Sequence, residues 1–264
     1  METGPAKMKL SAVIITFNEE DRLPDALASL EGVADEIVVV DSYSTDRTAE
    51  IARQARTTFY QNRFEDYGQQ KNFAMQKAGH DWIINLDADE RVSPELKKTI
   101  IDLKEKGAPE TVAAFAIKRK AFYLGRWIRH SGWYPDRKVR LFRKNGALWQ
   151  GRIHEGLQVS GAIAPLSGDI LHFTYRDITD QVSRLNRYSV FQAEEIIRKN
   201  KKYLLLRLLI LPPVTFVRHY VWRLGFLDGF AGLVIATVSS WGTAMKYFKA
   251  IAMKRSATGR AQDS

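Results

Sequence analysis

Acidic residues gather at the end of an apolar segment, in the stretch WIINLDADE at residues 82–90. Asp87 and Asp89 stand one residue apart, and Glu90 follows directly. Carboxylates often occupy turns and helix starts, where they interact well with backbone N–H groups. Two close carboxylates also repel each other unless a positive charge lies beside them, and hard oxygen ligands suit Mg²⁺ or Mn²⁺, which bind phosphates. The spacing alone leaves a metal–phosphate site and a solvated acidic loop as open alternatives.

A regular alternation of strand and helix patterns surrounds this stretch. Four apolar segments predict strands, at residues 12–17, 36–42, 57–61 and 82–87. Helical patterns occur between and after them, around residues 21–31, 46–56, 66–78 and 94–106. This order predicts an α/β fold with a parallel sheet covered on both faces, in which ligands bind at the carboxyl ends of the strands. The polar loops at those ends would converge on one crevice, at residues 16–20, 41–46 and 87–90.

Composition and missing motifs limit the function classes. The 264-residue chain is long enough for one large or two small domains, and it has no Cys, so disulfides and thiol chemistry are excluded. It contains neither a G-x-G-x-x-G nor a G-K-[ST] loop, which argues against a dinucleotide fold and a P-loop kinase. The N-terminal residues lack the pattern of a secretory signal, so we expect synthesis to end in the cytoplasm.

Four motifs in order along the chain resemble the nucleotide-sugar half of glycosyltransferase family 2. They are a strand followed by TFNEE, then VVVDSYSTDRT, GQQKNFAMQKA and WIINLDADE, over about the first 110 residues. The resemblance implies the GT-A fold and transfer of a sugar with inversion. Two shorter motifs, HEG at 154–156 and GFLDG at 225–229, are similar to those of bacterial enzymes that glucosylate the lipopolysaccharide inner core.

The resemblance also implies a role for each motif position. Asp89 would bind a Mg²⁺ or Mn²⁺ ion that stabilises the leaving UDP, and Asp87 would lie nearer the ribose or the donor sugar. Asp41 would hydrogen-bond the uracil ring or the ribose. Lys71 would assist the phosphates as a point charge, although a lysine on a helix surface is an equally good interpretation. The residues that would line the base and ribose pocket are Thr16, Phe17, Asn18 and Glu19.

Inverting transfer needs a base that takes the proton from the acceptor hydroxyl, and in the GT-A pattern this carboxylate lies in the second half of the domain. Glu155 in RIHEG occupies the position at which the resembled subgroup places its base, with His154 beside it. Asp136 in WYPDR is the alternative base, and we expect it instead to hold Arg137 or Arg140 in place. No second His follows at i+4, so this pair does not predict a zinc protease.

Charge is distributed unevenly along the chain. The net charge of +10 combines an acidic first part with two basic blocks, at residues 117–145 and 176–264. The first block holds ten Lys and Arg against one Asp and interleaves them with aromatic residues, a composition that suits phosphates and sugar rings. Beside a sugar-donor site, a phosphorylated lipid-linked glycan fits this block better than RNA or DNA, and we expect no nucleic-acid partner.

Two apolar runs dominate the last third of the chain, at residues 203–217 and 224–245. The second is long enough to cross ~30 Å of hydrocarbon, but it contains Asp228, and Pro212 and Pro213 break the first. Lys, Arg, Tyr and Trp flank both runs, as on an interfacial surface. We expect peripheral or monotopic helices that lie in, or dip into, the cytoplasmic face of the inner membrane. A core helix pair or an oligomer interface is the alternative.

These patterns predict an inverting, metal-dependent hexosyltransferase. It would move a hexose, glucose in the resembled subgroup, from a UDP-sugar to a lipid-linked glycan such as the lipopolysaccharide inner core. The predicted domains are a GT-A domain at 1–175, with a donor half (1–116) and an acceptor half (117–175), and a helical, membrane-associating region at 176–264.

Two alternative functions remain at this stage. A polyprenyl phosphate is the rival acceptor for the same kind of enzyme. The alternative of another class is a non-enzymatic basic module that binds anionic lipid or RNA. Such a module would have no use for converging Asp41, Asp87 and Asp89 unless a cation bridges them.

Overall fold

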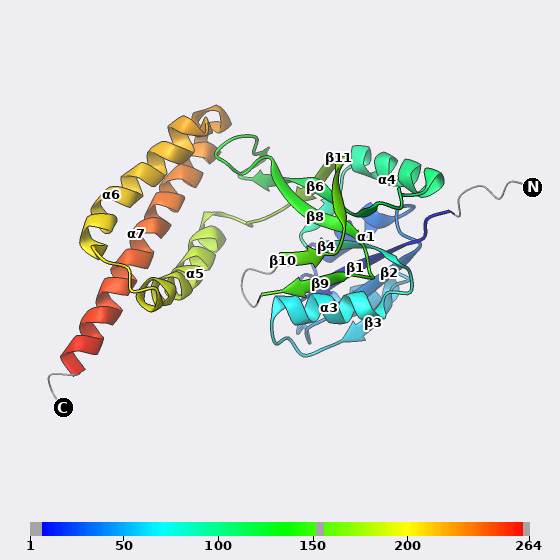
Figure 1. Cartoon of the computed structure of the whole chain (residues 1–264), viewed down its shortest axis with the longest axis horizontal. Helices are drawn as coiled ribbons and strands as arrows, with labels where there is room; N and C mark the ends of the chain where they lie inside the picture. Colours follow the sequence, from blue (N-terminus) through cyan, green and yellow to red (C-terminus); the bar gives the residue numbers. More distant parts are fainter. Residues whose placement is uncertain (1–6, 152–155, 261–264) are drawn as a thin grey trace, which may run out of the picture. The chain divides into compact units, whose positions relative to one another are not determined.

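The structure falls into two compact units. The computed structural model describes residues 7–151 and 156–260 of the chain (Figure 1). A sheet unit consists of Met1–Lys120 and Asp136–His172, and a helical unit consists of Ala121–Pro135 and Phe173–Ser264. The predicted domains at 1–175 and 176–264 stay a prediction, because a grouping by contact does not test which parts of the chain fold independently.

The first four strands of the sheet unit form the parallel arrangement that the sequence predicts. They lie in the order β3-β2-β1-β4, and neighbouring strands run parallel. Their bounds are β1 (Leu10–Thr16), β2 (Glu36–Asp41), β3 (Thr58–Gln61) and β4 (Trp82–Asp87). The helices between and after them are α1 (Leu23–Leu30), α2 (Thr48–Gln54), α3 (Tyr67–Lys77) and α4 (Pro94–Lys106). Each of these predicted strands and helices is confirmed, with small displacements at the ends.

Strand register brings the polar loops to one edge of the sheet. Thr16 at the end of β1 pairs with Asp41 at the end of β2, and Ile15 pairs with Asp87 at the end of β4. Parallel strands in this register end side by side, so the loops that follow them start from neighbouring positions. The predicted convergence of the three loops is therefore confirmed at the level of the backbone.

A second set of strands continues the sheet in antiparallel fashion. The order is β4-β8-β6-β11-β5, and β9 and β10 pair with each other outside this sheet. The bounds are β5 (Glu90–Val92), β6 (Val112–Tyr123), β8 (Asp136–Arg143), β9 (Ala147–Gln150), β10 (Gly156–Val159) and β11 (Ala162–His172). The sequence predicted the acceptor half by its charge and not by its strands, because these strands mix basic and apolar residues and their partners lie far away in the chain.

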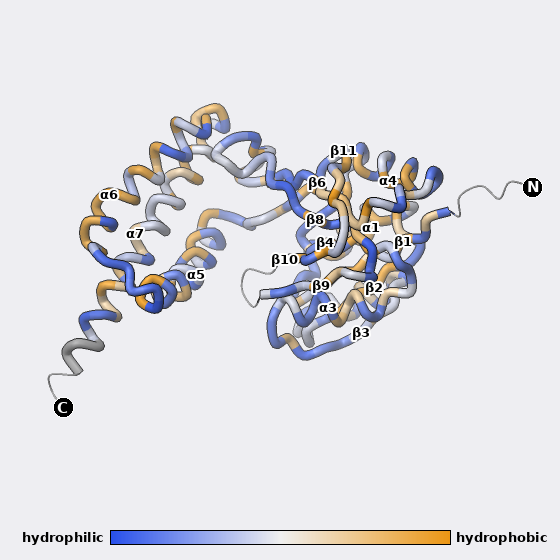
Figure 2. The backbone as a smooth tube through the Cα atoms, in the orientation of Figure 1, coloured by the Kyte–Doolittle hydropathy of each residue, from blue (hydrophilic) through white to orange (hydrophobic). Residues whose placement is uncertain are grey.

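Apolar side chains cover both faces of this sheet. On one face, residues of β1 and β4 pack against α1 and α4, among them Ile14, Ile84, Leu23 and Leu96. On the other face a second cluster includes Val38, Ile83 and Ala74 of α3, with Phe142 of β8 and Trp149 of β9. Figure 2 shows apolar residues along the central strands. Burial on both faces fixes the sheet, and with it the edge at which the loops meet.

The helical unit contains the helices predicted for the last third of the chain. They are α5 (Ile178–Arg198), α6 (Leu204–Val217), the π-helical turn η1 (Arg218–Trp222), the 3₁₀ turn η2 (Gly225–Asp228) and α7 (Gly229–Arg260). The unit also includes the segment 121–135, with the short strand β7 (Arg126–Trp127) paired to the end of β6.

Helix α6 continues through Pro212 and Pro213, so the expectation that these residues break the first apolar run is wrong. Proline removes a backbone donor and disfavours the helix interior, but tertiary contacts offset that cost here. Leu208 and Leu211 pack against the cluster around Tyr247 of α7. Ser240 of α7 also donates a hydrogen bond to the carbonyl oxygen of Pro212 at 2.8 Å.

The outward side of α6 is apolar. Leu205, Leu206, Leu209 and Ile210 are exposed, and no residue of α6 is fully buried among those described. By length and composition, the described helices include one stretch able to cross a membrane, Leu204–Trp222, with a mean hydropathy of 1.4. This stretch is the first apolar run, not the second, because η2 and Gly229 interrupt the second near its start.

Candidate functional site

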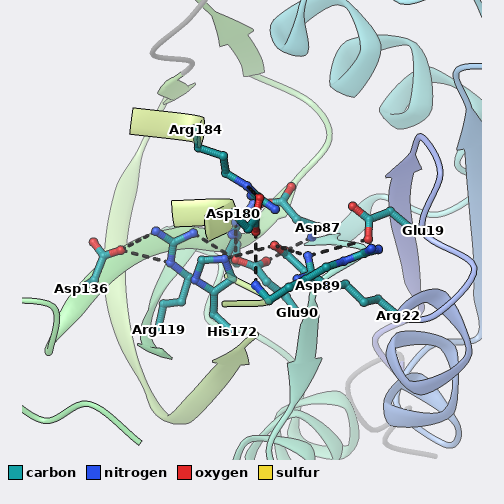
Figure 3. Close-up of polar contacts among 12 residues, drawn as sticks. Glu19, Arg22, Asp87, Asp89, Glu90, Arg119, Asp136, His172, Asp180 and Arg184 are labelled. Carbon is teal, nitrogen blue, oxygen red and sulfur yellow. Dashed lines mark hydrogen bonds and ion pairs between the residues drawn. The ribbon is translucent and has the colours of Figure 1, made fainter. Parts of the chain in front are cut away.

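Asp87, the last residue of β4, lies between two basic side chains (Figure 3). Its Oδ2 is 2.6 Å from Nη2 of Arg140 on β8, and its Oδ1 is 3.1 Å from Nζ of Lys71 on α3. Arg140 and Lys71 are buried, whereas the Asp87 side chain is partly exposed. Two fixed cations therefore hold one carboxylate at the edge of the sheet with part of its surface accessible.

Glu90 connects Asp87 and Arg140 to a second arginine. Its Oε1 is 2.6 Å from Nη2 of Arg140 and 3.3 Å from Nη1 of Arg119 on β6, and the Glu90 side chain is fully buried. Its Oε2 accepts a hydrogen bond from the backbone N–H of Asp87 at 3.1 Å. The loop from Asp87 to Glu90 is thus held by buried ionic contacts and not by solvent-exposed acidic groups.

The charge of Asp87 is fixed by this network. Burial by itself would raise the pKa of Asp87, but Arg140 and then Lys71 outweigh it and lower the pKa well below its ordinary value. Burial likewise opposes the charged form of Arg140, and Asp87 and Glu90 reverse that effect and raise its pKa. Asp87 is therefore ionised throughout the physiological range.

Asp89 lies beside a histidine that the sequence analysis did not single out. Its Oδ2 is 3.4 Å from Nε2 of His172, the last residue of β11, and 3.6 Å from Nη1 of Arg22 (Figure 3). His172 reaches this position because β11 pairs antiparallel with β5, which places His172 opposite Glu90. A carboxylate and an imidazole nitrogen thus lie next to each other at the carboxyl end of β4.

This pair fits a small divalent cation. Ligand atoms of one such ion lie roughly 3 Å apart, because each is about 2.1 Å from the metal, and Asp89 and His172 supply one carboxylate and one imidazole. Among the described residues no group of three or more His, Cys, Asp or Glu side chains gathers into a complete metal site. A protein that supplies only one or two ligands to Mg²⁺ or Mn²⁺ leaves positions for waters and substrate phosphates.

The loops after β1 and β2 are locked to each other through Asp41. This buried carboxylate accepts hydrogen bonds from Thr16 Oγ1 at 3.1 Å, from the backbone N–H of Ser44 at 2.9 Å and from the Ser44 hydroxyl. In turn, Ser44 Oγ accepts from the backbone N–H of Asn18 at 2.9 Å, and Asn18 Oδ1 accepts from the N–H of Thr45 at 2.8 Å. The predicted pocket residues Thr16, Asn18 and Asp41 therefore belong to one hydrogen-bonded structure.

Two aromatic rings stand exposed on these loops. Phe17 is 57% and Tyr43 56% exposed, although large aromatic side chains are usually covered. Tyr43 has a φ of 61° and its neighbour across the loops, Asn18, a φ of 55°, a region that few non-glycine residues occupy. Glu19, the fourth predicted pocket residue, has its backbone N–H bonded to Thr48 Oγ1 at 2.8 Å. Exposed rings on strained loops are typical of a ligand platform.

Helix α3 connects these loops to the rest of the site through three consecutive residues of the motif QQKN. Gln70 bonds Ser42 and Asn62, after β2 and β3, and Lys71 pairs with Asp87 at the end of β4. Asn72 exchanges two hydrogen bonds with the backbone of Trp149 on β9, at 2.9 and 3.0 Å. The interpretation of Lys71 as a helix-surface residue is wrong, because its side chain is 2% exposed and its Nζ lies over the Trp149 ring. Its role toward phosphates stays a prediction.

The structure describes one of the two candidate bases, Asp136. Asp136 Oδ2 accepts from Nη2 and Nε of Arg119, at 2.7 and 3.1 Å, so it holds Arg119 and not Arg137 or Arg140 as expected. Glu155 lies outside the described residues, which resume at Gly156 at the start of β10. Its assignment as the base stays a prediction.

Several site residues escaped the sequence analysis, namely Gln70, Asn72, Glu90, Arg119, Arg140 and His172. Glu90 was noticed only as a third carboxylate of the acidic stretch. Arg140 was expected only as a partner of Asp136, and Arg119 stood among ten basic residues of one block without a feature that separated it. Alternation does not distinguish Arg140, because Arg140, Leu141 and Phe142 are buried in succession. His172 carries no local signal, because its partner is more than eighty residues away.

We expect the stability of the Asp87→Asn variant to fall less steeply with decreasing pH than the stability of the unchanged protein. Because the pKa of Asp87 is lowered on folding, its ion pairs stabilise fully above the ordinary aspartate pKa of about 4 and this contribution is lost as the pH falls toward the folded-state value. The difference in unfolding free energy between the two proteins should be constant above about pH 5 and shrink below about pH 4. Urea unfolding at a series of pH values measures it.

The matched control is Asp102→Asn, which changes an exposed carboxylate of α4. This variant should follow the unchanged protein at every pH. A difference for Asp87→Asn that stays the same in acid would contradict the assignment of a lowered pKa to Asp87.

Comparison with known proteins shows to which family the chain belongs. The model of the family described as glycosyl transferase family 2 matches residues 11–156. The lipopolysaccharide core biosynthesis glycosyltransferase LpsC of Rhizobium meliloti is 31% identical over 260 residues, which cover 94% of this chain and 95% of that protein. An uncharacterized glycosyltransferase of Rickettsia typhi is 29% identical over 251 residues, which cover 91% of this chain and 86% of that protein.

Solved structures show more distant likenesses. Staphylococcus aureus TarS is 19% identical with a TM-score of 0.42, over 70% of this chain and 40% of that one. Glucosyl-3-phosphoglycerate synthase from Mycobacterium tuberculosis, in complex with Mn²⁺, UDP and phosphoglyceric acid, is 21% identical with a TM-score of 0.36, over 46% of this chain and 45% of that one. The matches span less than half the length of these two structures, and TM-scores of this size add nothing to the fold assignment.

The assignment rests instead on the family model, which covers more than half of the chain, on a relative matched over nearly its whole length, and on the strand order of the sheet unit. This chain belongs to glycosyltransferase family 2, and its mixed sheet followed by long helices is the GT-A fold with a C-terminal helical region.

Proposed function

We propose that this glycosyltransferase moves glucose, with inversion, from UDP-glucose to a lipid-linked glycan of the lipopolysaccharide inner core. The observation that carries the proposal is the arrangement at the end of β4, where Asp87 is held ionised between Lys71 and Arg140 while Asp89 lies against His172. The likeness to LpsC over nearly the whole of both chains supports the choice of acceptor. The closely packed acidic loop has no comparable use in a module that only binds anionic lipid or RNA.

In this proposal the exposed rings and the Asp41 loops receive the nucleoside. Phe17 and Tyr43 offer faces on which a uracil ring stacks. Asp41 is buried and already accepts several hydrogen bonds, so its main effect is to fix the loops that carry Phe17, Asn18 and Tyr43. Asp87 presents its partly exposed carboxylate to the hydroxyl groups of the ribose or of the donor sugar. Pre-organised groups of this kind reduce the entropic cost of binding.

Asp89 and His172 are the residues that would hold a Mg²⁺ or Mn²⁺ ion. When bound, such an ion neutralises the negative charge that develops on the leaving diphosphate. Arg22, 3.6 Å from Asp89, balances the carboxylate when no cation is present. Lys71 is committed to Asp87, so its charge acts on the diphosphate through the local field and by keeping Asp87 in place.

Glu155 is the proposed base that takes the proton from the acceptor hydroxyl. The supporting observation is that Asp136, the other candidate, is engaged by both nitrogens of one edge of the Arg119 guanidinium. A carboxylate committed to those two contacts is less available to an acceptor hydroxyl, which a base must reach at hydrogen-bond distance. The hydrogen bonds between Asn72 and Trp149 attach β9, which ends at Gln150, to the helix that also carries Lys71.

Membrane attachment through the helical unit fits a lipid-borne acceptor. The exposed side of α6 carries leucines of which Leu209 is 73% exposed, and a stripe of this size on a water-soluble surface is unusual. The opposite side of α6 packs on α7. A helix with one packed side and one apolar exposed side suits an in-plane position at the cytoplasmic membrane face better than a full span.

The first prediction concerns the metal. UDP binding should depend on a divalent cation, and Asp89→Ala should abolish the metal-dependent part of it. His172→Ala should weaken UDP affinity by roughly 10-fold or more, since it removes the second protein ligand. Calorimetric titration of UDP with Mn²⁺ and with EDTA measures both effects, with Asp102→Ala as the control. Equal UDP affinity in Mn²⁺ and in EDTA would remove the metal from the proposal.

The second prediction concerns the base and the acceptor. Glu155→Gln should keep UDP binding while transfer of glucose from UDP-glucose to core-truncated lipopolysaccharide falls by ~10²-fold or more, the range expected for a lost general base. Asp136→Asn should retain far more activity. Product analysis by NMR should show a β-linked glucose if the donor is α-linked.

Other outcomes of this assay are informative. If Asp136→Asn lost transfer in this way and Glu155→Gln stayed active, the base would be Asp136. Transfer to a polyprenyl phosphate and not to the truncated lipopolysaccharide would show that polyprenyl phosphate is the acceptor. Turnover with another UDP-sugar and not with UDP-glucose would show that the donor sugar is not glucose.

The third prediction concerns the exposed side of α6. The double variant Leu205→Glu with Leu209→Glu should bind vesicles about 10-fold more weakly or worse, because each buried leucine side chain contributes about 1.5–3 kcal/mol. Its UDP affinity should not change. Vesicle flotation measures binding, with Ile163→Glu, which changes an exposed apolar residue of β11, as the control. Equal flotation of the unchanged protein and the double variant would place membrane contact elsewhere.

A further inference from the structure

A buried carboxylate anchors the segment 126–130 to the turn that follows α6. Asp228, in the motif GFLDG, is 1% exposed. Its carboxylate accepts hydrogen bonds from the backbone N–H groups of Arg129 and His130, at 3.1 and 2.9 Å, and contacts the His130 ring at 3.2 Å. Arg126 Nη1 donates to the Asp228 carbonyl oxygen at 2.7 Å. All these residues belong to the helical unit, so the carboxylate joins two parts of one compact body.

The next residues of the segment are fixed to η1. The backbone N–H of Ser131 donates to the carbonyl oxygen of Arg223 at 2.9 Å, and the Ser131 carbonyl oxygen lies 2.8 Å from Nδ1 of His219. The guanidinium of Arg223 covers Gly132, since a Cβ atom there would lie 2.0 Å from its Nη1. Gly132 also has a φ of +74°, so this close approach needs a glycine.

These contacts gather basic side chains without supplying carboxylates for them. Asp228 is occupied by backbone N–H groups and by His130. In the part of the chain that the structure describes, no acidic side chain forms an ion pair with Arg129, Arg218 or Arg223. Arg129 and Arg218 are exposed. Three arginines, each able to donate two hydrogen bonds to one phosphate, therefore belong to segments of the helical unit that are held together by these contacts.

Exposed apolar residues occupy the same turn. Trp222 and Phe230 are each 69% exposed, and Leu227 is half exposed. Aromatic side chains mixed with arginine are typical of the level of lipid headgroups, where the rings lie below the phosphates that the arginines bind. Cations alone would not distinguish a soluble anion from a membrane, but exposed Trp and Phe beside them favour a lipid.

We propose that Arg129, Arg218 and Arg223 form a binding site for the phosphate group of an anionic lipid, which seats the turn from η1 to α7 in the headgroup layer. This inference deepens the proposed membrane attachment and rests on it. It assigns to GFLDG a positioning role, because Asp228 holds the segment that carries Arg129 against the turn that carries Arg218 and Arg223. The ligand is a phosphate on a lipid, and a soluble phosphate or a nucleic acid is an outcome of the test.

The test compares two variants that lose the same charge. Arg129→Gln with Arg218→Gln removes two arginines of the site. Arg187→Gln with Lys98→Gln removes two exposed cations elsewhere, on α5 and α4, that have no acidic partner among the described residues. The full chain is floated with vesicles of phosphatidylcholine alone, and with vesicles that also contain phosphatidylglycerol. UDP affinity is measured on the same samples.

We expect the unchanged protein and the Arg187/Lys98 control to float more strongly with the anionic vesicles. The Arg129/Arg218 variant should lose roughly 10-fold or more of that added binding, because each basic residue near an anionic surface contributes about a factor of five. All three proteins should bind UDP equally. Glycerol phosphate, added at constant ionic strength, should not release the protein from the vesicles.

Equal losses for the two variants would overturn the inference in favour of diffuse electrostatic attraction. Displacement by glycerol phosphate would identify a site for soluble phosphate, and stronger binding of a short RNA than of anionic vesicles would identify a nucleic-acid site. If the unchanged protein floated with neither kind of vesicle, the proposed membrane attachment itself would fall. Loss of UDP binding in the Arg129/Arg218 variant would show general damage to the fold. The paired variant Arg129→Lys with Arg218→Lys, which keeps the charge, would then distinguish damage to the fold from loss of the lipid site.

Discussion

The buried contact of Arg140 with Asp87 and Glu90 is the interaction on which the proposed donor site depends. Arg140 belongs to the antiparallel half of the sheet, and the two carboxylates flank the loop that ends the parallel half. One guanidinium therefore joins the two halves at the point where a ligand would bind. Removing one partner of such a buried group leaves an uncompensated charge, which commonly costs about 3–5 kcal/mol. This constraint explains why a loop rich in carboxylates can remain closely packed.

Around this contact, α3 acts as a second connection. Its three consecutive polar residues reach the loops after β2 and β3, the end of β4 and the backbone of β9. Because one helical turn makes all three contacts, a shift of the helix would move the loops after β2 and β3, the ionised Asp87 and the strand before the predicted base together. These contacts connect the parts of the site to one another without a bound ligand, and such preorganisation lowers the cost of catalysis.

The helical unit repeats this principle with a different carboxylate. Asp228 is buried and accepts hydrogen bonds from backbone N–H groups, and the buried Asp41 of the sheet unit accepts them from one backbone N–H group and from side-chain hydroxyls. In both places a buried acid fixes a loop and does not react, and the exposed groups nearby carry the proposed binding role. A carboxylate in a sequence motif can therefore have a structural role, in which it holds a loop in place through hydrogen bonds.

Local sequence patterns predicted the parallel half of the fold. The strands and helices up to residue 106 follow from apolar periodicity and from caps such as Ser93, which accepts a hydrogen bond from Leu96 at the start of α4. The convergence of the loops after β1, β2 and β4 follows from the same order, because parallel strands end at one edge. The composition of the last third likewise predicted helices with an apolar exposed side.

Tertiary structure decided which charged residues meet. Arg140 and Asp87 are 53 residues apart in the chain, and Asn72 and Trp149 are 77 apart. No local period links such positions, so ten basic residues of one block looked equivalent until the pairing of β8 with β4 buried one of them. The same holds for His172 beside Asp89, which depends on the antiparallel pairing of β11 with β5. Sequence periodicity records which face of an element is buried, whereas the partner of a buried charge is set by strand order and register, which only the folded chain determines.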